Sequence, residues 1–175
     1  MTRTTMKSIF LFLFFHIALF ANFIEIHSFS ANFKQIITDE KNKKLVYTGL
    51  LQAKEPQSAL WFYKTPVKKS IYIRKNRVII IEPELEQVII KNIPANFDFF
   101  HMIQNAKEVK KNMYVAMIDA KAYTIIISKG VVSSIFYSDD FGNSVKILFS
   151  KQSQNTKIND TIFNPIIPSE YDIIQ

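Results

Sequence analysis

Residues 29–34 read Phe29-Ser30-Ala31-Asn32-Phe33-Lys34, so that apolar side chains occupy every odd position. Successive side chains of a β-strand point to opposite faces, and this alternation therefore predicts a strand with one apolar and one polar face. Similar short segments, separated by polar turns, follow along most of the chain. The pattern indicates a mainly β protein built on an antiparallel sheet.

Further strands are predicted wherever alternating or β-branched segments lie between polar turns. They are expected at residues 45–53, 59–63, 67–74, 77–81, 87–91, 113–118, 123–128, 131–138, 144–150 and 158–163. Gly49 marks a bend or bulge inside one of them, and Lys75-Asn76 forms a tight hairpin turn because asparagine tolerates positive φ. About ten strands at this spacing are typical of a barrel or a strongly curved sheet.

One segment, residues 94–104, departs from the two-residue period and has helical character, with Pro94 and Asn96 as possible start signals. Its apolar side chains fall on one face at Phe97, Phe100 and Ile103, beside Gln104, and on the other at Phe99 and Met102. A helix that is apolar nearly all round must be buried on more than one side. It is either a plug in the end of an ordinary barrel or a lid over a hydrophobic hollow.

The N-terminal residues have the organisation of a secretory signal peptide. Arg3 and Lys7 supply positive charge, and an apolar run extends from Ile9 to Ala21. This run is shorter than the ~20 residues that a membrane-spanning helix needs, and it ends on a small residue as a cleavage site requires. We therefore expect residues 1–21 to be removed on export to the periplasm.

The remaining residues, 22–175, are enough for one domain with its own core. The formal charge of +7 for the whole chain falls to +5 without Arg3 and Lys7. Export argues against nucleic acid as a partner, so the charge either favours acidic partners and anionic lipid surfaces or serves solubility alone. The absence of cysteine excludes disulfides, thiol catalysis, thiolate metal sites and a lipid-modified N-terminal cysteine.

No catalytic residue, metal site or cofactor is predicted. Outside the signal segment the histidines are His27 and His101, and neither has a second ligand at metal spacing. The chain has three glycines and neither a nucleophile elbow nor a phosphate-binding loop. It has sixteen phenylalanines instead, and this surplus of large apolar side chains either fills a core or lines a hollow for an apolar ligand. We do not expect an enzyme.

Several motifs occur in an order that resembles the LolA family of lipoprotein carriers. They are Phe29-x-Ala31-x-Phe33-x-Gln35, Tyr47-x-Gly49, Pro56 with Trp61-x-Tyr63-x-x-Pro66, Ile80 to Val88 around Pro83, and Phe163 to Pro168 followed by Asp172-Ile173-Ile174. The resemblance spans essentially the whole chain after residue 21. It implies an unclosed, strongly curved antiparallel β-sheet, a half-barrel, with an α-helical lid over a hydrophobic cavity.

The resemblance also implies a function. Such carriers bind the acyl chains of lipoproteins released from the inner membrane and shuttle them to the outer membrane. The implied partners of a monomeric carrier are triacylated lipoproteins, a LolCDE-type ABC exporter, and either a LolB-type receptor or the outer membrane directly. The alternative is a periplasmic sensor module of the same fold that binds a lipid or peptide without transporting it.

Strand parity and the resemblance together place side chains on the cavity wall. Those expected there are Phe29, Ala31, Phe33, Trp61, Tyr63, Ile71, Ile73, Val88, Ile90, Val115, Met117, Ile147 and Phe149. The expected lid contacts are Phe97, Phe100 and Ile103. For each of these residues, packing in an ordinary core is the competing role.

Position 55 departs from the family pattern. The family often has an arginine before the proline that matches Pro56, where it helps to hold the lid, and this chain has Glu55 there. Lys54 carries a positive charge beside it, but its side chain is expected on the opposite face of the strand. The way in which the lid is held therefore does not transfer from the family to this chain.

Overall fold

The computed structural model describes residues 25–93 and 99–175. The predicted signal peptide at residues 1–21, the predicted helix start at Pro94 or Asn96 and the predicted lid residue Phe97 lie outside these ranges. The strands are β1 (Ser28–Thr38), β2 (Lys44–Lys54), β3 (Ser58–Thr65), β4 (Lys69–Arg74), β5 (Arg77–Glu82), β6 (Gln87–Asn92), β7 (Lys107–Lys110), β8 (Met113–Ile118), β9 (Lys121–Ser128), β10 (Val131–Ser138), β11 (Ser144–Gln154) and β12 (Asp172–Ile174). The helices are the α-helix α1 (Phe99–Gln104) and the 3-10 turns η1 (Pro83–Leu85) and η2 (Asp160–Phe163).

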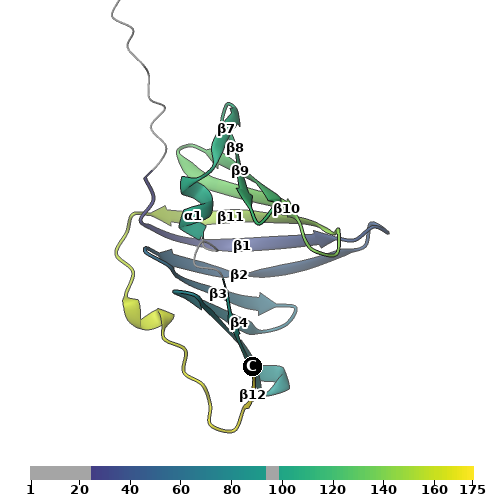
Figure 1. Ribbon diagram of the computed structural model, residues 1–175, viewed down its shortest axis with the longest axis vertical. Coiled ribbons are helices and arrows are strands. Elements are labelled where there is room, and N and C mark those ends of the chain that lie inside the picture. Colours follow the sequence, from purple (N-terminus) through teal and green to yellow (C-terminus); the bar gives the residue numbers. More distant parts are fainter. Residues whose placement is uncertain (1–24, 94–98) are drawn as a thin grey trace, which may run out of the picture.

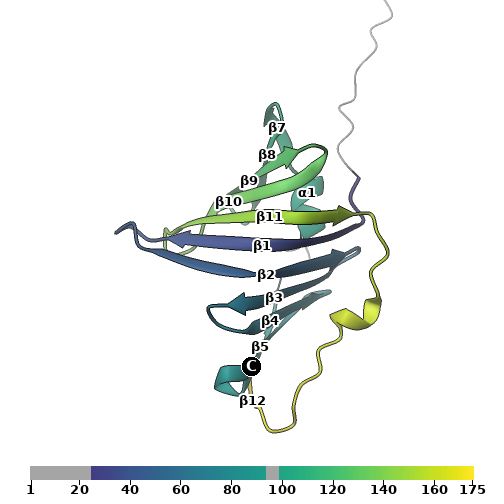
Figure 2. The same cartoon turned by 180° about the vertical axis from the view of Figure 1, so that it is seen from behind.

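The strands form one sheet in the order β12-β6-β5-β4-β3-β2-β1-β11-β10-β9-β8-β7. Neighbouring strands are antiparallel except β12, which pairs with β6 in parallel. Strands β7 and β12 form the two edges and do not pair with each other, which means that the sheet does not close. The sheet is strongly curved (Figures 1 and 2). The predicted curved, unclosed antiparallel sheet is confirmed, with a single parallel edge strand added.

The two sides of the sheet follow from the alternation in β1. Phe29, Ala31 and Phe33 are buried on one side, which we call the concave face because α1 packs against it. Residues directly opposite each other in an antiparallel pair share a face, and β1 pairs these three with Ala53, Leu51 and Gly49 of β2. The pairing of each further strand identifies its concave residues in the same way, and the apolar side chains on this face form the main core.

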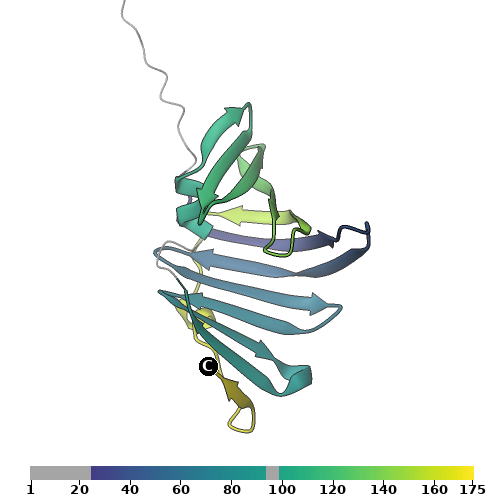
Figure 3. The same ribbon diagram turned by 45° about the vertical axis from the view of Figure 1, so that its right-hand side comes forward.

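The C-terminal segment covers part of the other, convex face, as Figure 3 shows for the yellow trace that runs behind the sheet. The strand predicted at residues 158–163 is wrong, because this stretch contains η2 instead. The side chain of Asn159 accepts a hydrogen bond from the backbone N–H of Thr161 at 3.0 Å and so caps the 3-10 turn. The turn contacts β3 and β4, and its Phe163 is buried in a layer separate from the concave core.

Three local features refine the strand prediction. The edge strands β7 and β12 were not predicted, because every residue in them is exposed and pairing with β8 and β6 is what orders them. The break at Pro83 is confirmed, since Pro83 begins η1. The hairpin turn at residues 75–76 is also confirmed, although Lys75 rather than Asn76 has the positive φ, at 55°.

Gly49 is the residue that permits the closest approach between strands. A Cβ atom at this position would overlap the backbone carbonyl oxygen of Phe62 and lie 2.6 Å from the ring of Phe33. The register between β2 and β3 shifts between Thr48 and Gly49, as expected for a bulge. Phe33 therefore occupies the space that a side chain would need.

Replacing Gly49 with alanine should lower the free energy of unfolding by about 3 kcal/mol, because the added methyl group meets backbone on one side and a buried ring on the other. Urea denaturation of the purified chain measures the change. Gly130→Asn is the matched control: nothing lies within 4 Å of a Cβ there, and asparagine accepts its φ of +79°. A loss for Gly49→Ala no larger than that of the control would contradict the close packing.

Candidate hydrophobic cavity

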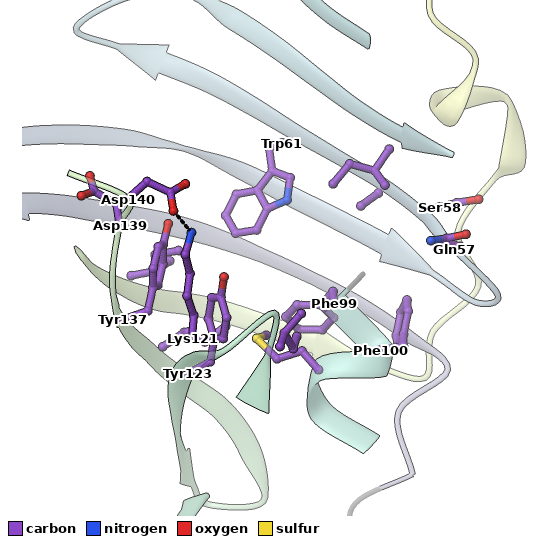
Figure 4. A pocket seen from close by; sticks show the side chains of 16 residues that line it. Gln57, Ser58, Trp61, Phe99, Phe100, Lys121, Tyr123, Tyr137, Asp139 and Asp140 are labelled. Atoms are coloured by element: carbon purple, nitrogen blue, oxygen red, sulfur yellow. Dashed lines mark ion pairs between the residues drawn. The ribbon is translucent and has the colours of Figure 1, made fainter. Parts of the chain in front are cut away.

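A cavity of about 430 Å³ lies between α1 and the concave face of the sheet. Figure 4 shows the side chains that surround it. They come from β3, β4 and the turn before β3, from α1, and from β8 to β11, and are Gln57, Ser58, Ala59, Trp61, Ile73, Phe99, Phe100, Met102, Ile118, Lys121, Tyr123, Ile135, Tyr137, Asp139, Asp140 and Ile147. Most of the wall is apolar, and the polar groups gather at its two ends.

Aromatic rings hold the deepest part of the wall in place. Phe33 makes edge-to-face contacts with Trp61 and Tyr63, at centroid distances of 5.1 and 4.9 Å. Phe29 contacts Phe99 of α1 at 5.0 Å, so the lid helix rests directly on the first strand. Such ring pairs add to the stabilisation that burial gives. Trp61 remains half-buried and turns its ring toward the cavity (Figure 4).

One buried polar contact fixes the floor beside these rings. The hydroxyl of Tyr63 donates a hydrogen bond to Oε1 of Gln35 at 2.8 Å, and both side chains are buried. Burial raises the pKa of Tyr63 well above its usual range, so the hydroxyl stays neutral and keeps its proton for this bond. Gln35 belongs to the Phe29-x-Ala31-x-Phe33-x-Gln35 motif, and this bond explains a polar residue on an otherwise apolar face.

Charged groups stand at the cavity end formed by the turns after β8 and β10. Lys121 forms an ion pair with Asp140, which the dashed line in Figure 4 marks. Tyr123 and Tyr137 lie beside them with ring centroids 5.0 Å apart. Burial raises the pKa of Tyr137 to about 12 and also raises that of Tyr123, so both phenols are neutral hydrogen-bonding groups near neutral pH.

The other end of the cavity is lined by Gln57 and Ser58, and outside it a polar contact ties α1 to the turn between β2 and β3. Nε2 of Gln104 donates a hydrogen bond to Oε1 of Glu55 at 2.7 Å. Oε2 of the same carboxylate lies 2.7 Å from Nδ1 of His27, whose Nε2 is 3.4 Å from Glu25. The hydrogen bond that His27 donates to Glu55 raises the pKa of His27, as do the charges of Glu55 and Glu25. We call Gln104, Glu55 and His27 the Glu55 latch.

Glu55 thus occupies a lid-holding position with the opposite charge to the arginine that the family often carries. Lys54 does not replace that arginine, because it points to the convex face and pairs with Asp160 of η2 at 2.7 Å. This orientation of Lys54 was predicted from strand parity and is confirmed.

Most of the predicted wall residues lie on the concave side. Trp61, Ile73 and Ile147 line the cavity itself. The others form or pack against the core beneath it, and are Phe29, Ala31, Phe33, Tyr63, Ile71 and Phe149. Of the predicted lid contacts, Phe100 lines the cavity and Ile103 is buried in the same core. The apolar helix is therefore a cover over a hollow as well as part of the core.

Val88 and Ile90 lie on the convex face, and their assignment to the cavity is wrong. The register pairs Trp61 with Ile71, Ile71 with Ile80, and Ile80 with Ile89, which makes Ile89 the concave residue of β6. The turn at η1, between β5 and β6, determines whether the odd- or the even-numbered residues of β6 face the cavity. The alternation in an earlier strand does not determine this.

The assignment of Val115 and Met117 to the cavity wall is also wrong. Their neighbours Ala116 and Ile118 are buried, whereas Met117 is 63% exposed on the convex face. The segment Met113–Ile118 is apolar at both parities, so the sequence carries no signal for the inward set. Pairing of Ala116 with Tyr123 in β9 is what identifies it.

Other wall residues were missed. Tyr123 and Ile125 share the inward parity of β9, an alternation that was available in the sequence. Lys121 begins β9, whereas Asp139 and Asp140 lie in the turn after β10, and nothing local indicates that these two places meet at one cavity. In residues 25–93 and 99–175 no cluster of three potential metal ligands is found, and no helix has the length and apolar character to cross a membrane.

Comparison with known proteins identifies the family. A family model described as outer membrane lipoprotein carrier protein LolA matches residues 25–128. An outer-membrane lipoprotein carrier protein of Campylobacter jejuni is 40% identical over 97% of this chain and 100% of its own length. One from Helicobacter pylori strain J99 is 38% identical over 79% of this chain and 74% of its own.

A solved structure shares the fold: an uncharacterized conserved protein from Thermus thermophilus superposes with a TM-score of 0.53 at 9% identity, covering 85% of this chain and 90% of that one. The likeness supports the curved-sheet architecture. Taken with the family model and the two relatives, the cavity under a short apolar helix has a clear setting: this chain belongs to the LolA family of outer membrane lipoprotein carrier proteins.

Proposed function

We propose that this protein is a carrier that covers the acyl chains of lipoproteins leaving the inner membrane and takes them to the outer membrane. The observation that supports this most directly is the apolar cavity between α1 and the concave face. Membership of a family of carriers agrees with it and does not call for catalysis. The sensor alternative has no observation in its favour.

The physical obstacle to moving a lipoprotein from one membrane to the other is the water between them. Three long acyl chains contain roughly 45 methylenes, and exposing them at ~0.8 kcal/mol each costs about 35 kcal/mol. Broad apolar contact offsets this cost without directional bonds, and cargo can therefore leave again when another apolar site is offered. A wall of Trp61, Ile73 and Ile147 under Phe99 and Phe100 supplies contact of this kind.

The size of the cavity requires the lid to move. A methylene takes up about the 30 Å³ that one water molecule occupies in the liquid, so 430 Å³ accommodates about one acyl chain. A triacylated anchor needs more room. Helix α1 is six residues long, and displacing it would enlarge the hollow without unpairing the central strands. The closed form is then the state without a full load.

Several finer parts of the proposal come from sequence and family resemblance. We propose that residues 1–21 are a cleaved signal peptide, that residues 22–175 act in the periplasm, and that the carrier is a monomer. The proposed donor is a LolCDE-type exporter. The proposed acceptor is a LolB-type receptor or the outer membrane directly. Cysteine-free composition fits a carrier that is not itself lipid-modified.

Trp61 and Phe62 offer a matched pair of variants, since they are neighbours on opposite faces of β3. Trp61→Glu should lower the yield of lipoprotein extracted from inner-membrane vesicles at least tenfold, because it places a charge in the apolar cavity. Phe62→Glu alters an exposed residue of the convex face and should extract normally. Equal extraction by both variants would refute the assignment of the cavity to cargo.

The Glu55 latch predicts a second effect. Glu55→Ala removes the acceptor of Gln104 and should speed hydrogen–deuterium exchange of the α1 amides about fivefold, the effect of one partly exposed charged hydrogen bond. Lys54→Ala is the control, because Lys54 pairs with Asp160 on the other face. Unchanged exchange in Glu55→Ala would show that apolar packing alone holds the lid.

The latch should also respond to pH. The pKa of His27 is raised in the folded chain, so the stabilisation it gives is complete below its ordinary value of 6.5 and is lost as pH rises through the raised value. Between about pH 6 and 8, exchange of the α1 amides, corrected for intrinsic rates, should therefore increase. The extra increase should be absent in Glu55→Ala. An identical pH profile in wild type and variant would contradict the coupling.

A further inference from the structure

The cavity has a chemical direction. Its central wall is apolar, and the end formed by the turns after β8 and β10 carries Lys121, Asp139 and Asp140 (Figure 4). An acyl chain in the apolar part would place its polar head at this charged rim. The other end is lined by the uncharged side chains of Gln57 and Ser58 (Figure 4). We call Lys121, Asp139 and Asp140 the rim. The rim is therefore the part of the cavity that would contact the polar head, and the head is what distinguishes lipids with the same acyl chains.

The apolar wall cannot make that distinction. Dispersion and hydrophobic contact are non-directional, so they treat equal acyl chains alike whatever head they carry. A membrane presents many phospholipids, part of them anionic, alongside any lipoprotein. A carrier that extracts only one class must therefore disfavour the others through polar or charged groups.

The rim has a defined balance of charge. Lys121 forms an ion pair with Asp140 and is also attracted by Asp139, so the formal charges of these three groups add up to −1. Oδ1 of Asp139 accepts hydrogen bonds from the backbone N–H groups of Phe141 and Asn143 at 3.0 and 2.9 Å, which fix it in the turn. The hydrogen bond from the Asn143 side chain, then these backbone bonds and the charge of Lys121, lower the pKa of Asp139 and keep it ionised. The rim is thus anionic by one unit.

We propose that this rim selects cargo by its head: it accepts a neutral ester- or amide-linked head and rejects an anionic lipid. The inference rests on the proposed carrier function and deepens it. The Lys121 ammonium can donate to the carbonyl oxygen of an ester or amide, and Asp140 can accept from an amide N–H. A phosphate or free carboxylate at the same place would bring a second negative charge near Asp139, whose carboxylate points away from the cavity into its own turn (Figure 4), and would compete with Asp140 for Lys121.

A pair of single-chain probes isolates the head. Palmitamide and palmitate share one acyl chain, which the cavity accommodates, and differ in head charge. Trp61 is the only tryptophan of the chain and lines the cavity, so its fluorescence reports binding. Wild type should bind palmitamide about tenfold more tightly than palmitate, an effect of the size expected for one additional carboxylate near a partly exposed site. The preference should shrink as salt is added.

Variants of opposite sign test the cause. Asp139→Asn keeps an oxygen that can accept the turn hydrogen bonds and should reduce the preference to about twofold. Lys121→Met should instead widen it beyond that of wild type, because the attraction for an anion is lost. Glu84→Gln, on the distant turn η1, is the control and should leave it unchanged. Thermal unfolding of each variant confirms that it is folded.

The outcomes separate the two proposals. Equal binding of palmitamide and palmitate by wild type, with normal extraction of lipoprotein, would overturn selection at the rim and leave the carrier function intact. Shifts of the same sign in Asp139→Asn and Lys121→Met would also overturn it. If neither probe nor a triacylated lipopeptide binds, both proposals fall.

Discussion

The concave face of the sheet is apolar and must be kept from water, although the sheet does not close on itself. Closure would bury that face against the opposite wall, as in a small barrel. Here the edges β7 and β12 remain apart, and the face needs another cover. Helix α1 provides it with Phe99, Phe100, Met102 and Ile103, all buried. A helix that is apolar nearly all round is explained by this position between a core and a hollow.

The cover is made of parts with different strengths. Phe99 stacks against Phe29 in the central core, which anchors one side of α1. The end of the helix is held to the sheet by Gln104 and Glu55, near the surface where such bonds contribute little individually. The cavity lies beside these contacts and is lined on the helix side by Phe99, Phe100 and Met102. A carrier needs this combination, because cargo must enter under the lid without unfolding the sheet that bears it.

The convex face of the sheet is covered in part by the C-terminal segment. Phe163 is buried there by contacts with β3 and β4, and Lys54 and Asp160 join the same segment to β2. The last strand, β12, then extends the edge at β6. Curvature is therefore supported from behind by the C-terminal segment, while the concave face stays available for an apolar ligand. The two sides of β3 illustrate this division, with Trp61 facing the cavity and Phe62 the outside.

The order of residues along the chain was enough to predict the strands with clean alternation, the break at Pro83 and the inward side chains of β1, whereas the inward side chains of β3, whose residues 59–63 are all apolar, also needed the family resemblance. It was enough because period two in one strand needs no knowledge of other strands. The inward parity of β6 and β8 depends instead on the assembled sheet, since both faces of these strands are apolar and turn geometry sets their register. Folding alone brings Lys121 to Asp140, and Glu55 to Gln104, because such contacts join turns and helices far apart in the chain.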